Sequence, residues 1–289
     1  MVQRRLGAYI LPGDTVWLAK TLEAYYPLLD ELVVPVPTDG IGWAGRPIPV
    51  AEVLAIVRAV DHRRILRIVE GSWTDTAQPM REETAQRQAA LDELAGRVDW
   101  VLQIDNDEFL PDAGALARAM DAADVSRLSA IEWPMRVLFR RTKRWVFEVV
   151  GEGSESRFDY PGSIAVRPDV RLADARRVDG PLLRAVVVGD DASLQIRRPA
   201  AAGELRWAEL SPSDAIVHNS WARTPPAVWQ KTRSWGHADG LRSVAYFVLR
   251  WMPAPVTWRF ARDLHPFARG LWPRLARRAP SPELTDRAS

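Results

Sequence analysis

Short apolar runs alternate with stretches of helical spacing through the first hundred residues. The strand-like runs are residues 6–11, 31–36, 64–70 and 100–104. The stretches with a 3.6-residue apolar period are residues 15–26, 50–60 and 79–96. Strands that alternate with helices of this length are typical of βαβ units, in which helices cover both faces of a parallel sheet. We therefore expect a mostly parallel α/β sheet flanked by helices.

Residues at the expected helix ends agree with this reading. Asp14 precedes the first helical stretch and is expected to cap it, since a carboxylate can accept hydrogen bonds from free amides of a first turn. Pro79 suits the first turn of the third helix, and Gly96 suits its carboxyl end.

The pattern changes at about Ser129 to shorter apolar runs separated by turns. These runs are residues 129–141, 144–150, 163–168, 182–188 and 214–221, and they predict an added mixed or antiparallel part. A helix is expected over 225–237, with Pro225 as its first residue. We divide the chain into two halves of one domain, 1–128 and 129–240, and a helical tail, 241–289.

Composition narrows the classes of protein without choosing one. With 47% hydrophobic and 26% charged residues over 289 positions, the chain is ordinary for a soluble globular protein. The absence of cysteine excludes disulfides, thiolate metal sites and a cysteine nucleophile. No apolar stretch reaches the roughly 20 residues that span a bilayer. We expect a cytoplasmic protein, and no Walker loop, dinucleotide fingerprint or serine elbow is present.

The tail is strongly basic. Between Arg242 and Arg278 it contains eight arginines and one acid, Asp263, with tryptophans among them. Such a segment could lie on anionic lipid headgroups at the inner face of a membrane. It could equally be a solvated terminus whose tryptophans pack on the core.

Three acids follow the fourth strand in the sequence DWVLQIDNDEFLPD. If the strand continues, Asp105 and Asp107 point to the same side, because strand residues two apart share a face. Two carboxylates in one space suit Mg²⁺ or Mn²⁺. A calcium loop of the EF-hand type is excluded by Phe109 and Leu110, and a dehalogenase-like phosphotransferase would have threonine at position 109. The alternative is a solvated turn, with Asp112 capping the next helix.

The segment 83–111 resembles the region around the Asp-x-Asp motif of GT-A type glycosyltransferases, especially their large family-two group. Arg87 matches the arginine of the preceding helix, and Asp105, Asp107 and Glu108 match the acids. The segment 218–237 is similar to the same family's late histidine and following helix, with His218, Lys231 and His237 in the matching positions. The resemblance implies a GT-A, Rossmann-like fold with a nucleotide-sugar-binding first half.

The same resemblance implies roles for these residues. Asp105, Asp107 and His218 would bind Mn²⁺ or Mg²⁺, Arg87 and Asp105 would contact the donor, and Lys231 and His237 would lie near phosphate or acceptor. The run Thr38-Asp39-Gly40 is kept, but prolines stand where the family has its first acid, so Asp39 or Glu70 is expected to contact the base. Glu132 is the candidate general base among several acids of the second half.

The leading hypothesis is therefore a metal-dependent, inverting glycosyltransferase. It would use a nucleoside-diphosphate sugar and a glycan or lipid-linked acceptor, and nucleic acid is not an expected partner. A nucleotidyltransferase of related sheet architecture and a non-catalytic GT-A-like binding or scaffold protein are the alternatives.

Overall fold

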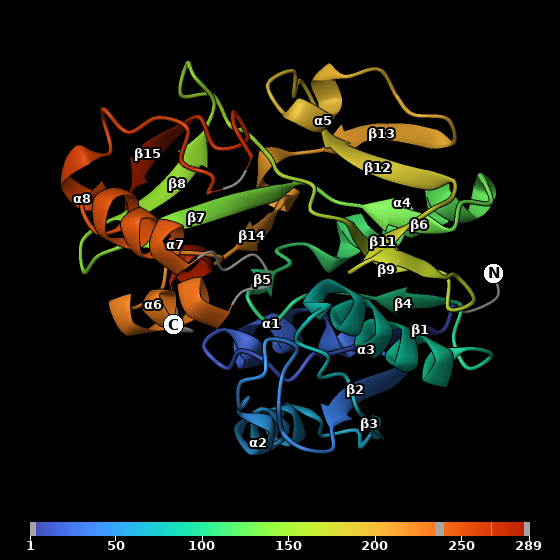
Figure 1. Cartoon of the computed structure of the whole chain (residues 1–289). Coiled ribbons are helices and arrows are strands. Elements are labelled where there is room, and N and C mark those ends of the chain that lie inside the picture. The colour runs from blue at the N-terminus through green and yellow to red at the C-terminus, as the bar shows by residue number, and fades with distance from the viewer. Residues whose placement is uncertain (1–3, 235–239, 267, 286–289) are drawn as a thin grey trace.

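The predicted βαβ units form the first part of the computed structural model, which describes residues 4–234, 240–266 and 268–285 (Figure 1). The parallel strands are β1 (Leu6–Tyr9), β2 (Glu31–Pro37), β3 (Leu66–Gly71) and β4 (Trp100–Leu102). The helices are α1 (Leu18–Tyr25), α2 (Val50–Val60), α3 (Pro79–Leu94) and α4 (Ala113–Val125), and the single turn η1 (Tyr26–Leu28) follows α1. Pro79 begins α3, and Gly96, at a φ of 73°, follows its end, as predicted.

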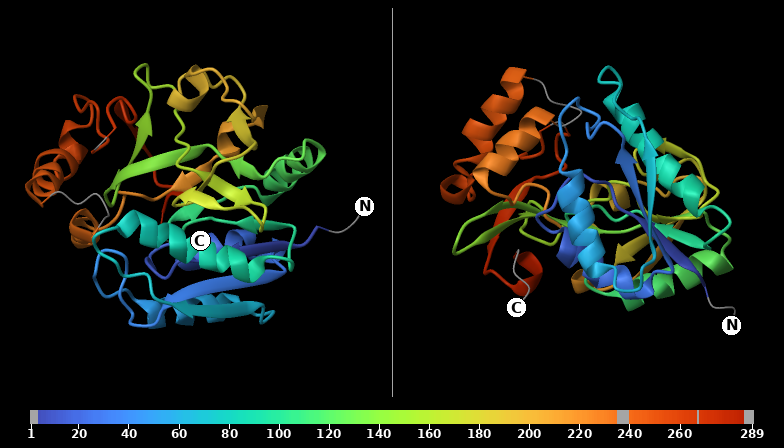
Figure 2. Two further views of the ribbon diagram at one scale, coloured as in Figure 1. Left: turned by 45° about the vertical axis from the view of Figure 1, so that its right-hand side comes forward. Right: turned by 90° about the horizontal axis from the view of Figure 1, so that it is seen from below.

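Helices cover both faces of this sheet because its strands are apolar on both sides. Along β2, Leu32 and Val34 pack into a core shared with α1, α2 and α4, whereas Val33 packs into a second core with α3. Figure 2 shows α2 and α3 on opposite sides of the strands. The predicted α/β class, a mostly parallel sheet flanked by helices, is confirmed.

The first sheet continues beyond β4 into the second half of the chain. Its order is β13-β12-β6-β9-β4-β1-β2-β3. The added strands are β6 (Ala130–Glu132), β9 (Ser163–Val166), β12 (Leu182–Val187) and β13 (Glu204–Leu210). Strand β9 runs antiparallel between β4 and β6, so it supplies the mixed part that the sequence predicted. Two connections between strands of this sheet contain further elements. The hairpin of β10 (Leu172–Asp174) and β11 (Arg177–Val178) lies between β9 and β12, and the short α5 (Leu194–Arg197) lies between β12 and β13.

A second sheet lies beside the first, with the order β15-β8-β7-β14-β5. Its strands are β5 (Glu108–Phe109), β7 (Met135–Arg141), β8 (Val146–Val150), β14 (Ile216–His218) and β15 (Arg274–Arg278). The turn η2 (Pro212–Asp214) precedes β14, and α6 (Pro225–Ser234), which begins at Pro225 as predicted, follows it. Because β4 belongs to the first sheet and β5 to the second, the acid motif lies where the two sheets meet.

The basic tail packs against the second sheet and contains more than the expected helices. It comprises α7 (Gly240–Tyr246), the π-helical turn η3 (Phe247–Trp251), α8 (Ala254–Thr257), strand β15 and the turn η4 (Pro282–Leu284). Strand β15 pairs antiparallel with β8. Trp251 and Trp272 are buried against Phe139, so tryptophans of the tail do pack on the core. Among the described residues, no helix is both long and apolar enough to cross a bilayer.

The expected role of Asp14 as a helix cap is wrong. Helix α1 begins only at Leu18, after Trp17, and no side chain caps it. The Asp14 carboxylate instead accepts a hydrogen bond of 2.8 Å from the amide of Val16 and closes a local turn. Its other oxygen pairs with Arg223, a residue of the site described below.

Candidate functional site

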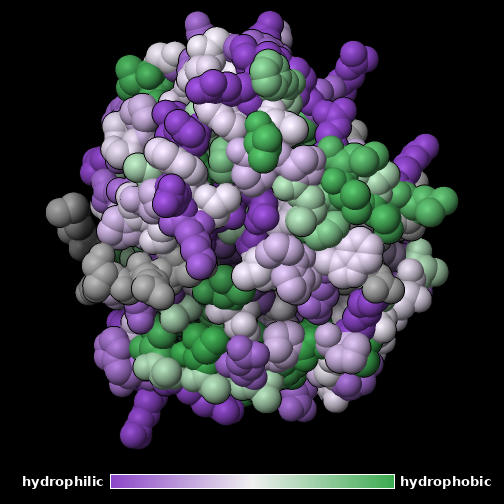
Figure 3. Space-filling model, turned by 90° about the vertical axis from the view of Figure 1, so that its left-hand side faces the viewer, coloured by the Kyte–Doolittle hydropathy of each residue, from purple (hydrophilic) through white to green (hydrophobic). Residues whose placement is uncertain are grey.

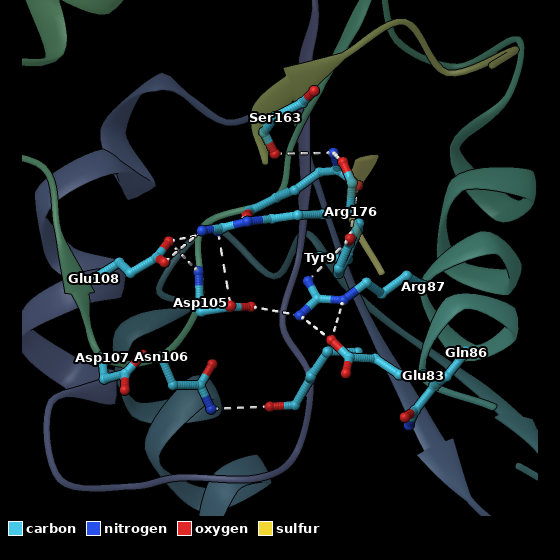
Figure 4. A network of polar contacts seen from close by, with 12 residues as sticks. Tyr9, Glu83, Gln86, Arg87, Asp105, Asn106, Asp107, Glu108, Ser163 and Arg176 are labelled. Atoms are coloured by element: carbon cyan, nitrogen blue, oxygen red, sulfur yellow. Dashed lines mark hydrogen bonds and ion pairs between the residues drawn. The ribbon is translucent and has the colours of Figure 1, made fainter. Parts of the chain in front are cut away.

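The acid motif occupies a turn rather than a continued strand. Strand β4 ends at Leu102, and the amide of Glu108 donates to the carbonyl of Asp105 over 3.0 Å, which closes a turn over residues 105–108. The strand alternation expected for Asp105 and Asp107 is therefore wrong. In Figure 4 the carboxylate of Asp105 points toward Arg87 and Arg176, whereas that of Asp107 points away from them.

Two arginines hold the inner side of the turn, and we call Arg87, Asp105, Glu108 and Arg176 the inner cluster. Arg176 makes two hydrogen bonds of 2.7 Å to the Glu108 carboxylate, which is fully buried. Arg87 donates to Asp105 over 2.9 Å, and Arg176 lies 3.7 Å from the other Asp105 oxygen. Each charge in the inner cluster therefore has an opposite partner, which the enclosed side chains of Arg87, Glu108 and Arg176 require.

The inner cluster favours the ionised form of Asp105. Burial would raise the pKa of Asp105, but the guanidinium groups of Arg87 and Arg176 outweigh it and lower that pKa below its ordinary value. Burial also raises the pKa of Tyr9, whose hydroxyl accepts from Arg87 over 3.3 Å, to about 12. Arg87 also donates to Glu83 one helical turn earlier over 2.8 Å, which fixes its direction.

A second group surrounds Asp107, and we call Asp14, Asp107, Arg223 and Lys231 the outer cluster. The Arg223 guanidinium lies between Asp14 and Asp107 and pairs with both. Lys231, on α6, lies 3.8 Å from the Asp107 carboxylate and donates to the Ser220 carbonyl over 2.9 Å. Nε2 of His218, at the end of β14, lies 3.7 Å from Asp107.

Neighbouring charges shift the pKa values of Asp107 and Lys231 in the outer cluster. For Asp107 they oppose the effect of burial, and for Lys231 the charge of Arg223 adds to it. Burial would raise the pKa of Asp107, but Arg223, His218 and Lys231 lower it far below the usual range. For Lys231, burial and the neighbouring Arg223 together lower the pKa to about 8, despite the attraction of Asp107. The ammonium of Lys231 therefore loses its proton closer to neutral pH than an ordinary lysine does.

The outer cluster, together with Arg87 and Asp105 of the inner cluster, lines one cavity of about 820 Å³ at the carboxyl ends of β1 and β4. Its charged lining comprises Asp14, Glu83, Arg87, Asp105, Asp107, Arg223 and Lys231, and its apolar wall includes Trp43 and Ile48. The Trp43 indole N–H donates to Gln86 over 2.7 Å, which holds the ring at the cavity wall. Ligands of open parallel sheets commonly bind at this edge of the strands.

The expected three-ligand metal site is not assembled. Among the residues that the structure describes, no three His, Asp or Glu side chains lie together as a metal-binding group. The physical reason is the turn, which directs Asp105 to two arginines, so that of the three expected ligands His218 and Asp107 lie together without Asp105. The three described residues therefore do not form the predicted metal site as they stand.

Of the other predicted site residues, the structure brings Arg87 and Lys231 to the cavity but not Asp39, Glu70 or Glu132. Asp39 is exposed and accepts from the amide of Ile41 in its own turn, and Glu70 is exposed on β3. Glu132, on β6, pairs with Arg184 of the neighbouring strand β12. His237 lies outside the described residues.

Four residues of the site were not predicted. Arg176 belongs to the β10–β11 hairpin, and no local pattern connects it with the acid motif. Trp43 lies in the loop after β2, four residues beyond Asp39. In this loop the resemblance predicts an acid, and not a tryptophan, as the contact to the base. Arg223 lies inside the segment that carries the second part of the resemblance, two residues before Pro225, and its charge at the start of the expected helix is the available signal. Asp14 was interpreted as a cap.

Comparison with known proteins leaves the family open. No protein-family model matches the sequence, and no curated protein sequence matches it. A 4-diphosphocytidyl-2C-methyl-D-erythritol synthase from Anaerococcus prevotii is similar over 57% of this chain and 71% of its own, at 13% identity and a TM-score of 0.32. A mannose-1-phosphate geranyltransferase from Thermus thermophilus is similar over 57% of this chain and 58% of its own, at 12% identity and a TM-score of 0.32. Likenesses this weak carry no argument about function.

Proposed function

We propose that the cavity binds a nucleoside-diphosphate sugar and that the protein transfers the sugar to an acceptor hydroxyl. The observation that carries the proposal is the outer cluster, where Arg223 and Lys231 place two cationic groups in one cavity beside Asp107. Guanidinium and ammonium groups are the side chains that proteins use to bind phosphate. The resemblance of the acid motif and of the segment 218–237 to GT-A glycosyltransferases supports the same substrate class.

The cavity offers separate surfaces for the parts of such a donor. The Trp43 ring, held by Gln86, provides a face on which a nucleobase can stack. The diphosphate would lie against Arg223 and Lys231. The sugar would then lie toward the turn of Asp105 and Asp107, whose carboxylates accept hydrogen bonds from hydroxyls.

During transfer the bond between the anomeric carbon and the diphosphate oxygen breaks, and the acceptor oxygen forms the new bond to that carbon. The electron pair leaves with the nucleoside diphosphate, and the acceptor proton passes to a base. Arg223 and Lys231 would stabilise the negative charge that develops on the leaving diphosphate, the largest electrostatic change of the reaction. Inversion at the anomeric carbon stays a prediction.

Metal dependence also stays a prediction, and the charge of the cavity gives it a physical basis. The lining carries four acids and three bases, so a bound diphosphate would add negative charge to a site that has no surplus of positive charge. A divalent ion that arrives with the nucleotide would supply that charge, since Mg²⁺ commonly binds through one or two carboxylates and substrate phosphates.

A product assay tests the proposal. The protein is incubated with UDP-, GDP-, CDP- and dTDP-sugars and a panel of simple glycoside and lipid-linked acceptors, with Mn²⁺, with Mg²⁺ or with EDTA. The expected result is release of one nucleoside diphosphate together with a glycosylated acceptor. Arg223→Ala should lose this activity, and Arg118→Ala, which changes an exposed arginine on α4, should keep it.

The same assay separates the alternative activities. Consumption of a nucleoside triphosphate and a sugar phosphate, with release of pyrophosphate, would identify a nucleotidyltransferase and contradict the proposal. Donor binding without turnover under any metal condition would favour the binding protein.

A further inference from the structure

Exposed apolar side chains gather on the helices of the tail. Of the 14 large apolar side chains that are exposed among the described residues, 7 lie between Leu241 and Phe260. We call the six most exposed of these the tail patch: Leu241, Val248, Leu249, Met252, Val256 and Phe260. Figure 3 shows apolar side chains concentrated on the face that carries these helices. A patch of this kind marks a surface that binds something.

The tail patch is not the side of the helices that packs on the protein, because other residues of the same segment already contact the second sheet. Trp251 is fully buried, and its indole N–H donates to the carbonyls of Phe139 and Trp221 over 3.0 Å each. The Tyr246 ring meets the Trp221 ring at 5.2 Å. The helices are thus fixed on the second sheet through one side while the other side stays apolar and exposed.

Positive charge accompanies the patch. The segment 240–262 contains four arginines and no acid. Arg250, Arg259 and Arg262 are exposed. Arg250 and Arg262 donate to backbone carbonyls of the same segment, Arg262 and Arg259 respectively, over 2.8 and 3.0 Å. Apolar side chains flanked by exposed arginines are the composition of a surface that enters the boundary between anionic headgroups and acyl chains.

We propose that the tail patch docks the protein on a bilayer that contains anionic phospholipid. A second copy of the chain fits less well, because a symmetric contact would bring the arginines of both copies together, and like charges repel. The site lies close to this surface, since the Trp229 ring of α6 meets the Phe247 ring of η3 at 5.2 Å and α6 also carries Lys231 of the cavity. Docking would therefore bring a lipid-linked acceptor near the cavity, an extension that goes beyond the proposed function.

Vesicle sedimentation tests the proposal without any activity assay. The purified full chain is mixed with vesicles of phosphatidylcholine alone or of phosphatidylcholine with phosphatidylglycerol, and the bound fraction is measured. The wild type should bind the anionic vesicles, and added salt should weaken that binding because it screens the arginines. The double variant Val256→Asp, Phe260→Asp should bind roughly tenfold more weakly, because it removes apolar area and adds negative charge.

A matched control separates the patch from exposed apolar residues in general. Val125, on α4, is 86% exposed, and Val256 is 84% exposed, so Val125→Asp is the matched control for the single variant Val256→Asp, which is measured beside the double variant. This control should bind as the wild type does, and circular dichroism should show all three variants folded. The proposal is overturned if the wild type binds neither vesicle, or if Val125→Asp weakens binding as much as Val256→Asp. It is also overturned if light scattering shows a dimer that the double variant abolishes, since the patch would then belong to a second copy.

Discussion

The inner and outer clusters contain the same kinds of groups but use them differently. In the inner cluster, Arg176 and Glu108 are almost completely enclosed and satisfy each other with two hydrogen bonds of 2.7 Å. In the outer cluster, the Asp107 carboxylate meets three cationic or protonatable groups, Arg223, His218 and Lys231, and lines the cavity. The inner pairing builds the turn, and the outer one leaves cations where an anionic ligand can reach them.

The largest expected effect is a difference in the free energy of unfolding between a variant of the inner cluster and a variant of the outer cluster. Glu108→Ala leaves the Arg176 guanidinium buried with Asp105, 3.7 Å away, as its remaining carboxylate partner, which should cost about 3 kcal/mol of unfolding free energy. Asp107→Ala should cost about 1 kcal/mol, because Arg223 keeps its pair with Asp14. Urea denaturation measures both values, and equal losses would contradict the division into two clusters.

The next effect concerns ligand affinity. Arg223→Ala should weaken binding of the preferred nucleoside diphosphate roughly 30-fold, the equivalent of about 2 kcal/mol for hydrogen bonds to a charged group. Titration calorimetry measures the dissociation constant, with Arg118→Ala as the control for the loss of an exposed arginine. An unchanged affinity in Arg223→Ala would remove the outer cluster from the binding site.

The smallest effect is a pH dependence of affinity. With a pKa of about 8, Lys231 loses its proton as the pH rises from 7 to 9, so nucleotide affinity should fall by up to roughly tenfold over that range. Lys231→Gln should bind more weakly at pH 7 and should show a flatter profile. A wild-type profile without a step near pH 8 would contradict this role.

The same shift has a defined sign for stability. The pKa of Lys231 is lower in the folded chain than its ordinary value of 10.5, so the unfolded chain binds more protons between about 8 and 10.5. The contribution of Lys231 to stability therefore rises with pH through that window. A comparison of urea midpoints for the wild type and Lys231→Gln at pH 7.5 and pH 10 checks this sign. As the pH rises, nucleotide affinity should fall while the contribution of Lys231 to stability increases.

Local patterns predicted the parallel strands, the helices between them and the position of the acid motif at the strand ends. The reason is that apolar periodicity, Pro79 and Gly96 act within a few residues. The same patterns could not reveal that the strand ends at Leu102, because the turn depends on Arg176, 68 residues beyond Glu108. Strand β15 escaped prediction for the same reason, since its partner β8 is distant and its own residues are mostly arginine.

The candidate site was predicted in part by resemblance and in part not at all. Arg87, Asp105, Asp107 and Lys231 do line one cavity, and His218 does lie beside Asp107. Asp39 and Glu70 do not reach the cavity, whereas Trp43, from the same loop as Asp39, does. Which residue of a loop faces a cavity depends on contacts such as the one between Trp43 and Gln86, which no periodicity encodes.

Binding of a nucleoside diphosphate in the cavity is the central claim, and thermal unfolding with UDP, GDP, CDP and dTDP, each with and without Mn²⁺, tests it most directly. A ligand at about 100 times its dissociation constant stabilises the folded state by roughly 2.7 kcal/mol. The account predicts such a stabilisation for one of the four nucleotides in the wild type and in Arg118→Ala, and its loss in Arg223→Ala. No stabilisation by any of the four, with or without Mn²⁺, would contradict it.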